Sequence, residues 1–267
     1  MKQLSLITGQ TKEEIAIDFI REYEPPEGWF GGFSGGKDSV VMKNLGDKAD
    51  TKKPIQWYYS ATGIDPPELV RFIREYHPEV KWLRPHMTRK RKFPDWPGTH
   101  SFFGMLQVAG LPLRLARWCC DDLKKNPSKN IPLMNRLMGL RAEESWMRAK
   151  RGEIHTYKNM TIYKPIFKWL TWEIWEYIES HSLPYCSLYD EGFDRLGCVI
   201  CPFLCHGVKG DLLRHMNRWP KQYRAFEKAM KKLFDNYLCV VNPRSGGMNF
   251  RGETDFDTFL NNWYNGE

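Results

Sequence analysis

The residues of this chain best suited to chemistry form one short run, Ser34-Gly35-Gly36-Lys37-Asp38-Ser39, between an apolar segment and a helical pattern. Gly35 and Gly36 can adopt positive φ, which lets backbone N–H groups approach a phosphate without interference from a Cβ atom. Lys37 offers a cation to phosphate oxygens, and Asp38 offers a carboxylate that can hold Mg²⁺. The run therefore predicts a binding site for a nucleoside triphosphate.

Two kinds of phosphate loop compete for this region. The spacing from Gly31 to Lys37 matches G-x-x-x-x-G-K, but that loop requires a following Ser or Thr whose hydroxyl binds Mg²⁺. Position 38 is an aspartate, so this alternative lacks its metal ligand. The string Ser34–Ser39 instead resembles the pyrophosphatase loop of the adenine nucleotide alpha hydrolase superfamily. That resemblance implies that ATP is cleaved to AMP and pyrophosphate through an adenylated intermediate.

The cysteines form the second group of reactive side chains, and there are seven of them. The chain has no apolar run approaching the roughly 20 residues that a membrane helix needs. Its first residues lack the features of a secretory signal. We therefore expect a cytoplasmic protein with no membrane association, in which cysteines serve metal or redox chemistry rather than disulfides.

The spacing of the cysteines is typical of a metal site. Cys119 and Cys120 are adjacent, whereas Cys198 and Cys201 form a C-x-x-C motif that Cys205 follows. Four thiolates suit either a [4Fe–4S] cluster or a single Zn²⁺ ion. Cys205 could replace Cys119 as the fourth ligand, and its spacing leaves that alternative open.

The formal net charge of +8 is concentrated in two basic segments. Lys81–Lys92 includes the run Arg89-Lys90-Arg91-Lys92 and has aromatic residues in and after it, and Lys209–Lys232 is basic and predicted to be helical. Clustered cations beside aromatic rings favour binding to a nucleic-acid backbone with unstacked bases. These segments predict DNA or tRNA as a partner.

The elements that must position these residues alternate between strands and helices. Strands are predicted at 29–33, 55–60, 80–83 and 135–140, with an extended segment at 162–166. Helices are predicted at 11–23, 39–48, 68–77, 102–108 and 171–180, with another opening at the cysteine pair. Thr11 with Glu14 forms a capping box, and Thr171 is the expected N-cap of the last of these helices.

This alternation predicts an α/β fold, a parallel sheet with helices on both faces, followed by a cysteine-bearing helical extension. The phosphate loop then lies at the carboxyl ends of the strands, where such sheets bind ligands. We also assign Thr62 and Gly63, which follow the second strand, to the nucleotide site. The expected organisation is an N-terminal helix at 1–24, a nucleotide-binding domain at 25–185 and a cluster-binding, basic extension at 186–267.

Four further motifs resemble one family, that of phosphoadenosine phosphosulfate reductase. They are an Arg-aromatic-Cys-Cys-x-x-Leu-Lys segment, a Gly-x-Arg-x-x-Glu-Ser strand end, a Pro-Ile-x-x-Trp-x-Thr helix start and a Leu-Tyr-Asp-x-Gly segment that leads to Gly-Cys-x-x-Cys-Pro. In this chain they are Arg117–Lys124, Gly139–Ser145, Pro165–Thr171 and Leu188–Pro202. The resemblance implies an adenine nucleotide alpha hydrolase-like fold.

The resemblance also implies roles for individual residues. Iron–sulfur members of the family have a similar cysteine arrangement, which implies a [4Fe–4S] cluster held by Cys119, Cys120, Cys198 and Cys201. Arg141 would meet a phosphate or sulfate group and would act with Lys37 and Asp38 as a catalytic residue. The neighbouring Glu144 and Arg148 are spaced as an i,i+4 surface pair.

Two departures from the sulfonucleotide reductases decide which reaction we expect. Those enzymes carry a modified loop without the Lys-Asp pair, and they attack with a cysteine in a Glu-Cys-Gly segment, whereas Cys239 lies in an apolar run. We therefore expect an ATP pyrophosphatase that uses ATP and Mg²⁺ to adenylate a nucleic-acid acceptor for sulfur insertion. Iron–sulfur ATP pyrophosphatases of DNA phosphorothioation systems are of this kind. The sulfur donor would be a protein such as a cysteine desulfurase.

Two alternatives remain open. One is a reductase of phosphoadenosine phosphosulfate or adenylyl sulfate in sulfur assimilation. The other is a nucleotide-sensing subunit, without enzymatic activity, of a modification or defence complex. The sequence assigns no oligomeric state.

Overall fold

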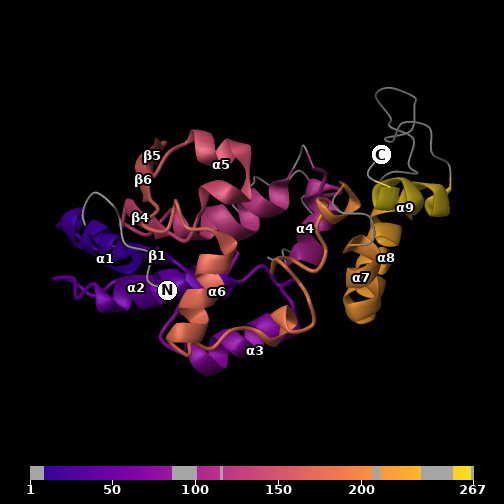
Figure 1. Ribbon diagram of the computed structural model, residues 1–267. Coiled ribbons are helices and arrows are strands. Elements are labelled where there is room, and N and C mark those ends of the chain that lie inside the picture. The colour runs from indigo at the N-terminus through magenta and orange to yellow at the C-terminus, as the bar shows by residue number, and fades with distance from the viewer. Residues whose placement is uncertain (1–8, 86–100, 115–116, 207–210, 236–254, 266–267) are drawn as a thin grey trace. The chain divides into compact units, whose positions relative to one another are not determined.

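The computed structural model describes residues 9–85, 101–114, 117–206, 211–235 and 255–265 (Figure 1). The chain divides into two compact units. The first unit comprises Met1–Ser60, Pro67–Leu83 and Lys129–Leu196, and the second comprises Ala61–Pro66, Arg84–Ser128 and Gly197–Glu267. The domain boundaries expected from the sequence, after residues 24 and 185, stay a prediction.

The first unit is built on a mostly parallel sheet. Its described strands are β1 (Phe30–Gly32), β2 (Gln56–Ser60), β3 (Lys81–Leu83), β4 (Asn135–Met138), β5 (Ile154–Tyr157) and β6 (Met160–Tyr163). They follow the order β3-β2-β1-β4-β6-β5, and every neighbouring pair is parallel except β5 with β6. The predicted α/β class is therefore confirmed.

Strand order places the ends of β1 and β4 together. Phe30 of β1 is in register with Gln56 of β2 on one side and with Arg136 of β4 on the other. The chain moves outward from β1 through β2 to β3 and then returns to the other side of β1. This reversal is the position at which open α/β sheets bind ligands, beyond the carboxyl ends of the strands.

Strand β5 is a strand that the sequence did not predict. It pairs antiparallel with β6 through a tight turn in which Lys158 has φ +56°. Three of its four residues are exposed and the fourth is half-buried. An edge strand with so little burial carries no apolar alternation, so the pattern that reveals other strands is absent here.

Helices pack around the sheet of the first unit. They are α1 (Lys12–Glu22), α2 (Lys37–Lys48), α3 (Pro67–Tyr76), α5 (Trp146–Lys150) and α6 (Thr171–Ser180). The capping box before α1 is confirmed, because the Thr11 hydroxyl accepts from the Glu14 N–H at 3.2 Å and the Glu14 carboxylate accepts from the Thr11 N–H at 2.7 Å.

The predicted N-cap of α6 is wrong by one residue. The N-cap is Leu170, whose backbone N–H donates to Glu173 Oε2 at 2.7 Å. Thr171 is the first helical residue, and its hydroxyl donates instead to Glu143 Oε2 at 2.8 Å. The Thr171 hydroxyl therefore hydrogen-bonds to Glu143, which is distant in sequence, instead of capping the helix as the local pattern predicted.

The second unit is helical in its described residues. It contains α4 (Phe102–Ala109), a π-helix (Cys120–Lys125), α7 (Asp211–Arg218), α8 (Pro220–Leu233) and α9 (Phe256–Asn265). The single helix expected across Lys209–Lys232 is two helices, because Pro220 has no N–H to continue α7 and instead starts α8. No described helix has the length and apolar character needed to cross a membrane.

Candidate functional site

The phosphate loop connects the end of β1 to the start of α2. Gly35 has φ +73°, and a Cβ added there would lie 2.6 Å from Leu69 Cδ1, so both the backbone conformation and the space require glycine. Gly36 is the N-cap of α2 with φ −79°, which corrects the expectation that both glycines use positive φ. Helix α2 therefore begins at Lys37, two residues earlier than expected.

Two serines hold the loop in shape. Ser39 is buried, and its hydroxyl donates to Gly36 O at 2.8 Å and accepts from the Ser34 N–H at 3.2 Å. The Ser34 hydroxyl lies 3.2 Å from the Ser39 hydroxyl and 3.4 Å from the Gly36 nitrogen. The buried Ser39 thus stabilises the turn from its interior side, whereas Ser34 lines the cavity.

Lys37 is held in place by one segment that is distant in sequence, residues 189–194. Its side chain is only 5% exposed, and Nζ donates to Asp194 O at 2.9 Å and lies 3.8 Å from Asp38 Oδ2. Its backbone N–H donates to the Tyr189 hydroxyl at 2.9 Å. Burial lowers the pKa of the Lys37 ammonium, an effect that the nearby Asp38 carboxylate opposes. Desolvation makes this ammonium a stronger partner for an incoming anion.

Arg141 follows β4 and reaches the start of α2. Its guanidinium is buried, with Nε 2.5 Å from Asp38 Oδ1 and Nη1 2.5 Å from Glu143 Oε2. Gly139 allows this approach, because a Cβ there would lie 2.8 Å from the Asp38 carbonyl oxygen. The structure thus brings together the three residues predicted to be catalytic, Lys37, Asp38 and Arg141. Their role stays a prediction.

A second ionic group adjoins the first. Glu144 accepts from the Arg141 N–H at 3.0 Å and pairs with Arg148, which confirms the i,i+4 pair expected from the sequence. Arg195, whose side chain is 72% exposed, lies 3.8 Å from Glu144 Oε1. Two arginines from different segments therefore share one carboxylate at the edge of the site.

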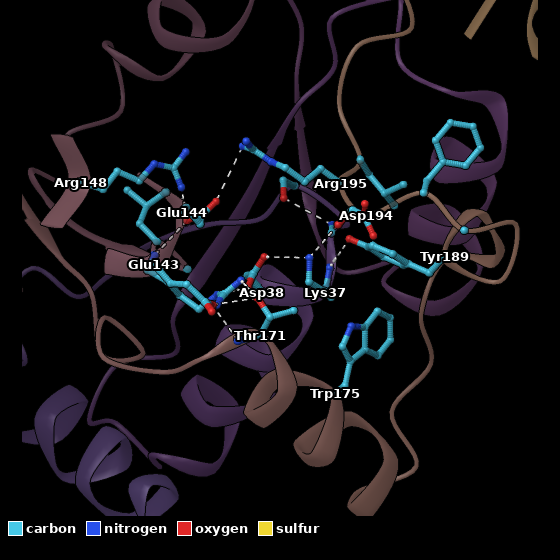
Figure 2. A pocket seen from close by; sticks show the side chains of 18 residues that line it. Lys37, Asp38, Glu143, Glu144, Arg148, Thr171, Trp175, Tyr189, Asp194 and Arg195 are labelled. Atoms are coloured by element: carbon cyan, nitrogen blue, oxygen red, sulfur yellow. Dashed lines mark hydrogen bonds and ion pairs between the residues drawn. The ribbon is translucent and has the colours of Figure 1, made fainter. Parts of the chain in front are cut away.

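These groups line one cavity of about 740 Å³ in the first unit. The lining comes from residues 34–38, 139–148, 171–175 and 189–196. Figure 2 shows cationic and anionic side chains converging in it from separate segments, with Trp175 and Tyr189 on one wall. A cavity at a helix N-terminus with buried cations can bind a polyanion and still offer carboxylates for a metal ion.

Sequence reasoning missed part of this lining. Tyr189 and Asp194 contact Lys37 but had no predicted role, although both lie in or beside a motif that resembles the family. Glu143 was seen only as a neighbour of Arg141, whereas it accepts from Arg141 and from both donors of Thr171. Only the motif resemblance could have signalled these residues, because each acts on a partner far away in sequence.

The second unit holds the predicted metal ligands. Cys119 and Cys120 are hydrogen-bonded to each other, and the neighbouring Cys120, Cys198 and Cys201 thiols, together with burial, raise the pKa of Cys119. The hydrogen bond from Cys119 and the nearby Lys124 and Arg117 charges lower the pKa of Cys120 to about 6, against the effect of burial. The four predicted ligands thus lie close enough to influence one another.

The C-x-x-C turn is held at Val199. The Val199 carbonyl accepts from the Tyr223 hydroxyl at 3.0 Å and pairs with His215 Nδ1 at 3.1 Å, so α7 and α8 both contact it. The Val199 N–H donates to Ile64 O at 2.8 Å. Three segments of the second unit therefore fix the backbone between Cys198 and Cys201.

Lys124 and Thr62 lie beside Cys198. Cys198 is the main cause of the raised pKa of Lys124, and the Thr62 hydroxyl lies 3.7 Å from Cys198 Sγ. Thr62 and Gly63 belong to the second unit, where Thr62 is buried and Gly63 has φ +80°. Their assignment to the nucleotide site stays a prediction.

Some of the remaining predictions concern residues outside the described part of the chain, namely Arg89–Lys92, Lys209 and Cys239. Cys205 is inside, and burial, followed by the charge of Cys201, raises its pKa to about 11. Among the residues that the structure describes, no three His, Cys, Asp or Glu side chains are grouped as ligands of one metal ion.

Comparison with known proteins finds relatives by sequence. An uncharacterized protein of Methanocaldococcus jannaschii is 30% identical over 216 residues, which are 77% of this chain and 42% of that protein. An adenosine 5′-phosphosulfate reductase of Allochromatium vinosum is 26% identical over 208 residues, covering 74% of this chain and 77% of the reductase. The chain spans less than half the length of the archaeal relative and of a second protein from the same organism.

The fold has a solved counterpart in a phosphoadenylyl-sulfate reductase of Candida auris, crystallised with phosphate. That structure aligns with a TM-score of 0.52 at 16% identity and covers 72% of this chain and 90% of the reductase. The model of the phosphoadenosine phosphosulfate reductase domain matches residues 30–204, from the first residue of β1 to just beyond the C-x-x-C motif. The chain therefore belongs to the phosphoadenosine phosphosulfate reductase domain family.

Proposed function

We propose that this protein is an ATP pyrophosphatase that adenylates an oxygen of a nucleic acid so that sulfur can replace it. The observation that carries the proposal is the arrangement of Lys37, Asp38 and Arg141 at the N-terminus of α2, in the cavity beyond β1 and β4. A ligand with a β,γ-pyrophosphate would use the whole loop, because the helix N-terminus and the buried ammonium both favour anionic oxygens.

The proposed reaction balances in two steps. The acceptor oxygen attacks the α-phosphorus of ATP, forming an O–P bond and releasing pyrophosphate, with Lys37 and the loop N–H groups stabilising the leaving charge. Hydrosulfide then attacks the activated atom; a cysteine desulfurase would supply it once a thiol has reduced the persulfide of that enzyme and has itself formed a disulfide. A bond to sulfur forms, the bond to oxygen breaks, and AMP leaves. The two steps at the acceptor require no oxidation or reduction beyond that release of hydrosulfide.

Asp38 fits the role of Mg²⁺ ligand. Its Oδ1 accepts from Arg141 at 2.5 Å, whereas within the described part of the chain Oδ2 has only the 3.8 Å contact with Lys37. Mg²⁺ commonly uses one or two carboxylates and takes its other ligands from phosphates and water. Arg141 would then orient Asp38 rather than replace the metal ion, which would supply charge neutralisation for the phosphates.

The cysteines fit a [4Fe–4S] cluster. Cys120, Cys198 and Cys201 all contribute to the raised pKa of Cys119, whereas the raised pKa of Cys205 owes its contribution from cysteine to Cys201, which supports Cys119 over Cys205 as a ligand. A zinc ion needs its four ligands around one metal atom. A [4Fe–4S] cluster takes one thiolate at each of its irons, so the four sulfur ligands lie farther from one another. When bound, the cluster would relay sulfur or brace the turn held at Val199.

A nucleic-acid acceptor is supported by the excess of cations in the chain, with a formal net charge of +8. Such a charge attracts polyanions from solution and strengthens their binding at low salt. DNA phosphorothioation and tRNA thiolation both replace an oxygen of a nucleic acid by sulfur, and either acceptor satisfies the proposed chemistry.

The decisive experiment measures pyrophosphate released from ATP with Mg²⁺ by anaerobically purified protein. Lys37→Met should abolish release, because it removes the buried ammonium but preserves the length of the side chain. Lys48→Met is the matched control, since Lys48 lies at the other end of the same helix and contacts Glu13. Equal release by the Lys37 variant and the unmodified protein would refute the assignment.

A second candidate function is reduction of adenylyl sulfate or phosphoadenosine phosphosulfate. The relative from Allochromatium vinosum, which is named as such a reductase, favours it. No cysteine lines the cavity in the described residues, and Cys239, which lies outside them, is the candidate thiol for this chemistry. Sulfite release that Cys239→Ser abolishes, with no pyrophosphate from ATP, would establish the reductase.

A further inference from the structure

One stretch of the first unit, besides the two basic segments already described, has a strong excess of cationic residues. From Ser145 to Trp172 there are six Lys and Arg residues and one acidic residue, Glu153. This stretch contains α5, the β5–β6 hairpin and the start of α6. Lys150, Arg151 and Lys158 are exposed, and the Lys168 side chain is 76% exposed. Exposed charge of one sign over neighbouring elements creates a field that attracts polyanions.

Large aromatic side chains are exposed in the same stretch. Trp146 is 71% exposed and Trp172 is 53% exposed, values unusual for tryptophan in a folded protein. Lys150 Nζ lies 5.3 Å from the centre of the Trp146 ring, and Lys158 Nζ lies 5.6 Å from the Tyr157 ring. Aromatic rings interleaved with cations match the two needs of a single-stranded nucleic acid, base stacking and phosphate neutralisation.

Both exposed tryptophans adjoin the lining of the cavity. Arg148 lines it from α5, two residues after Trp146, and Thr171 lines it from α6, immediately before Trp172 (Figure 2). Glu143 joins the two segments, because Glu143 Oε2 accepts from the Thr171 hydroxyl and the Thr171 N–H, each at 2.8 Å. Each exposed tryptophan therefore lies within two residues of a side chain, Arg148 or Thr171, that lines the candidate site.

We propose that a surface at the mouth of the cavity binds a single-stranded segment of nucleic acid and directs its acceptor group toward Lys37. This rim surface consists of Trp146, Lys150, Arg151, Lys168 and Trp172; Lys158 is excluded, because the β5–β6 turn lies at the amino end of β6, whereas the cavity lies beyond the carboxyl end of the parallel strand β4. The claim that the surface directs the acceptor group toward Lys37 rests on the proposed function. Binding of the nucleic-acid strand is itself independent of ATP. An acidic protein would need the cations but not the exposed aromatic rings, so the rings favour a nucleic acid.

The test uses the full chain and a short labelled oligonucleotide of mixed sequence, as single-stranded DNA, single-stranded RNA and duplex. The double variant Trp146→Ala with Trp172→Ala should weaken single-strand binding about 100-fold, or about tenfold for each lost stacking contact. The double variant Lys150→Gln with Lys168→Gln should flatten the log–log salt dependence by about 1.4, or about 0.7 for each phosphate contact.

Matched controls change exposed residues elsewhere in the first unit. Tyr76→Ala removes an aromatic ring that is 51% exposed on α3, and Lys52→Gln removes an exposed cation; both should bind the strand like the unmodified protein. Equal losses in the control and rim variants would overturn the proposal. Unchanged strand binding in the tryptophan variant, with polyglutamate displacing the oligonucleotide, would overturn it in favour of an acidic protein partner.

Pyrophosphate release from ATP without nucleic acid, in which water attacks the α-phosphorus in place of the acceptor oxygen and AMP and pyrophosphate are released, separates this inference from the proposed function. The rim variants should release pyrophosphate at the rate of the unmodified protein. If the unmodified protein releases none but the rim variants lose strand binding as expected, the ATP chemistry is wrong and the docking surface stands. If release is normal and strand binding is unaffected by the rim variants, the docking surface is wrong and the ATP chemistry stands.

Discussion

The cavity of the first unit and the cysteine group of the second both gather ionisable side chains, but they balance the charge differently. In the cavity, Arg141 lies against Asp38 and Glu143, and Arg148 lies against Glu144. Cations and anions of the protein thus satisfy one another before any ligand arrives. A site of this kind keeps its geometry without a ligand, which is the preorganisation that electrostatic catalysis requires.

The cysteine group lacks such internal balance. Burial raises the pKa of Cys198 and of Cys201, so without additional positive charge these thiols stay protonated. The Lys124 ammonium beside Cys198 offsets only part of the charge that four thiolates would carry. A metal centre would supply the remaining positive charge and displace the thiol protons. From this comparison we expect the first unit to keep its site without a ligand and the second unit to depend on a bound metal centre.

The largest expected effect comes from removing one proposed cysteine ligand, which should change the second unit but not the cavity of the first. Cys198→Ser should eliminate the brown colour and the absorbance near roughly 400 nm that thiolate-bound iron gives. It should leave ATP binding by the first unit intact. Iron and sulfide analysis of anaerobic preparations, together with ATP binding by calorimetry, measures both.

Cys186→Ser is the control for this experiment, because Cys186 is a buried thiol of the first unit and no proposed ligand. It should retain the full iron content. One zinc and no iron in the unmodified protein would replace the cluster by a structural zinc site. Loss of ATP binding together with the cluster would show that the first unit is not complete by itself.

A smaller effect is expected from Arg141→Lys, which tests preorganisation within the cavity. Lysine keeps the charge but cannot contact Asp38 and Glu143 at once through a planar fork. We expect pyrophosphate release to fall about 100-fold, the size typical of removing one fixed electrostatic group, while iron content is unchanged. The control is Arg71→Lys, whose side chain is 71% exposed on α3. A normal rate in the Arg141 variant would contradict a fixed role for the guanidinium.

The smallest expected effect is a pH dependence confined to the first unit. His77 packs against Phe33 and Phe72, and burial followed by the Lys43 charge lowers its pKa from 6.5 to about 4. Because the unfolded chain binds this proton more tightly, the folded state loses stability as the pH falls below 6.5. The loss between pH 7 and pH 5 should be about 2 kcal/mol.

Urea unfolding at both pH values measures this loss, and His77→Leu should reduce the difference by the same amount. The variant keeps an apolar group in the pocket but removes the titrating ring. An undiminished difference in the variant would assign the pH dependence to other groups. Iron content that falls with the same pH profile would contradict the separation between the two units.

Local signals in the sequence predicted much of the fold correctly. The capping box at Thr11 and Glu14 needs only neighbouring residues, and the start of α1 lies where that pattern predicts. The buried strands β1 and β2 are marked by short apolar and aromatic runs bounded by turn residues. The edge strand β5 lacks such a run, and Thr171 found a partner in Glu143 that no local rule describes.

By itself the sequence determined the phosphate loop, the family, the α/β class and the cysteine spacing, because each depends on residue types close together in the chain. Only the tertiary structure decided which groups meet. Asp38 pairs with Arg141 across 103 positions, and the Lys37 N–H meets Tyr189 across 152. Such contacts follow from the order of the strands, which places the ends of β1 and β4 side by side. A local pattern predicts each strand but not its neighbours, so the ionic pairs of the cavity could be known only once the sheet was assembled.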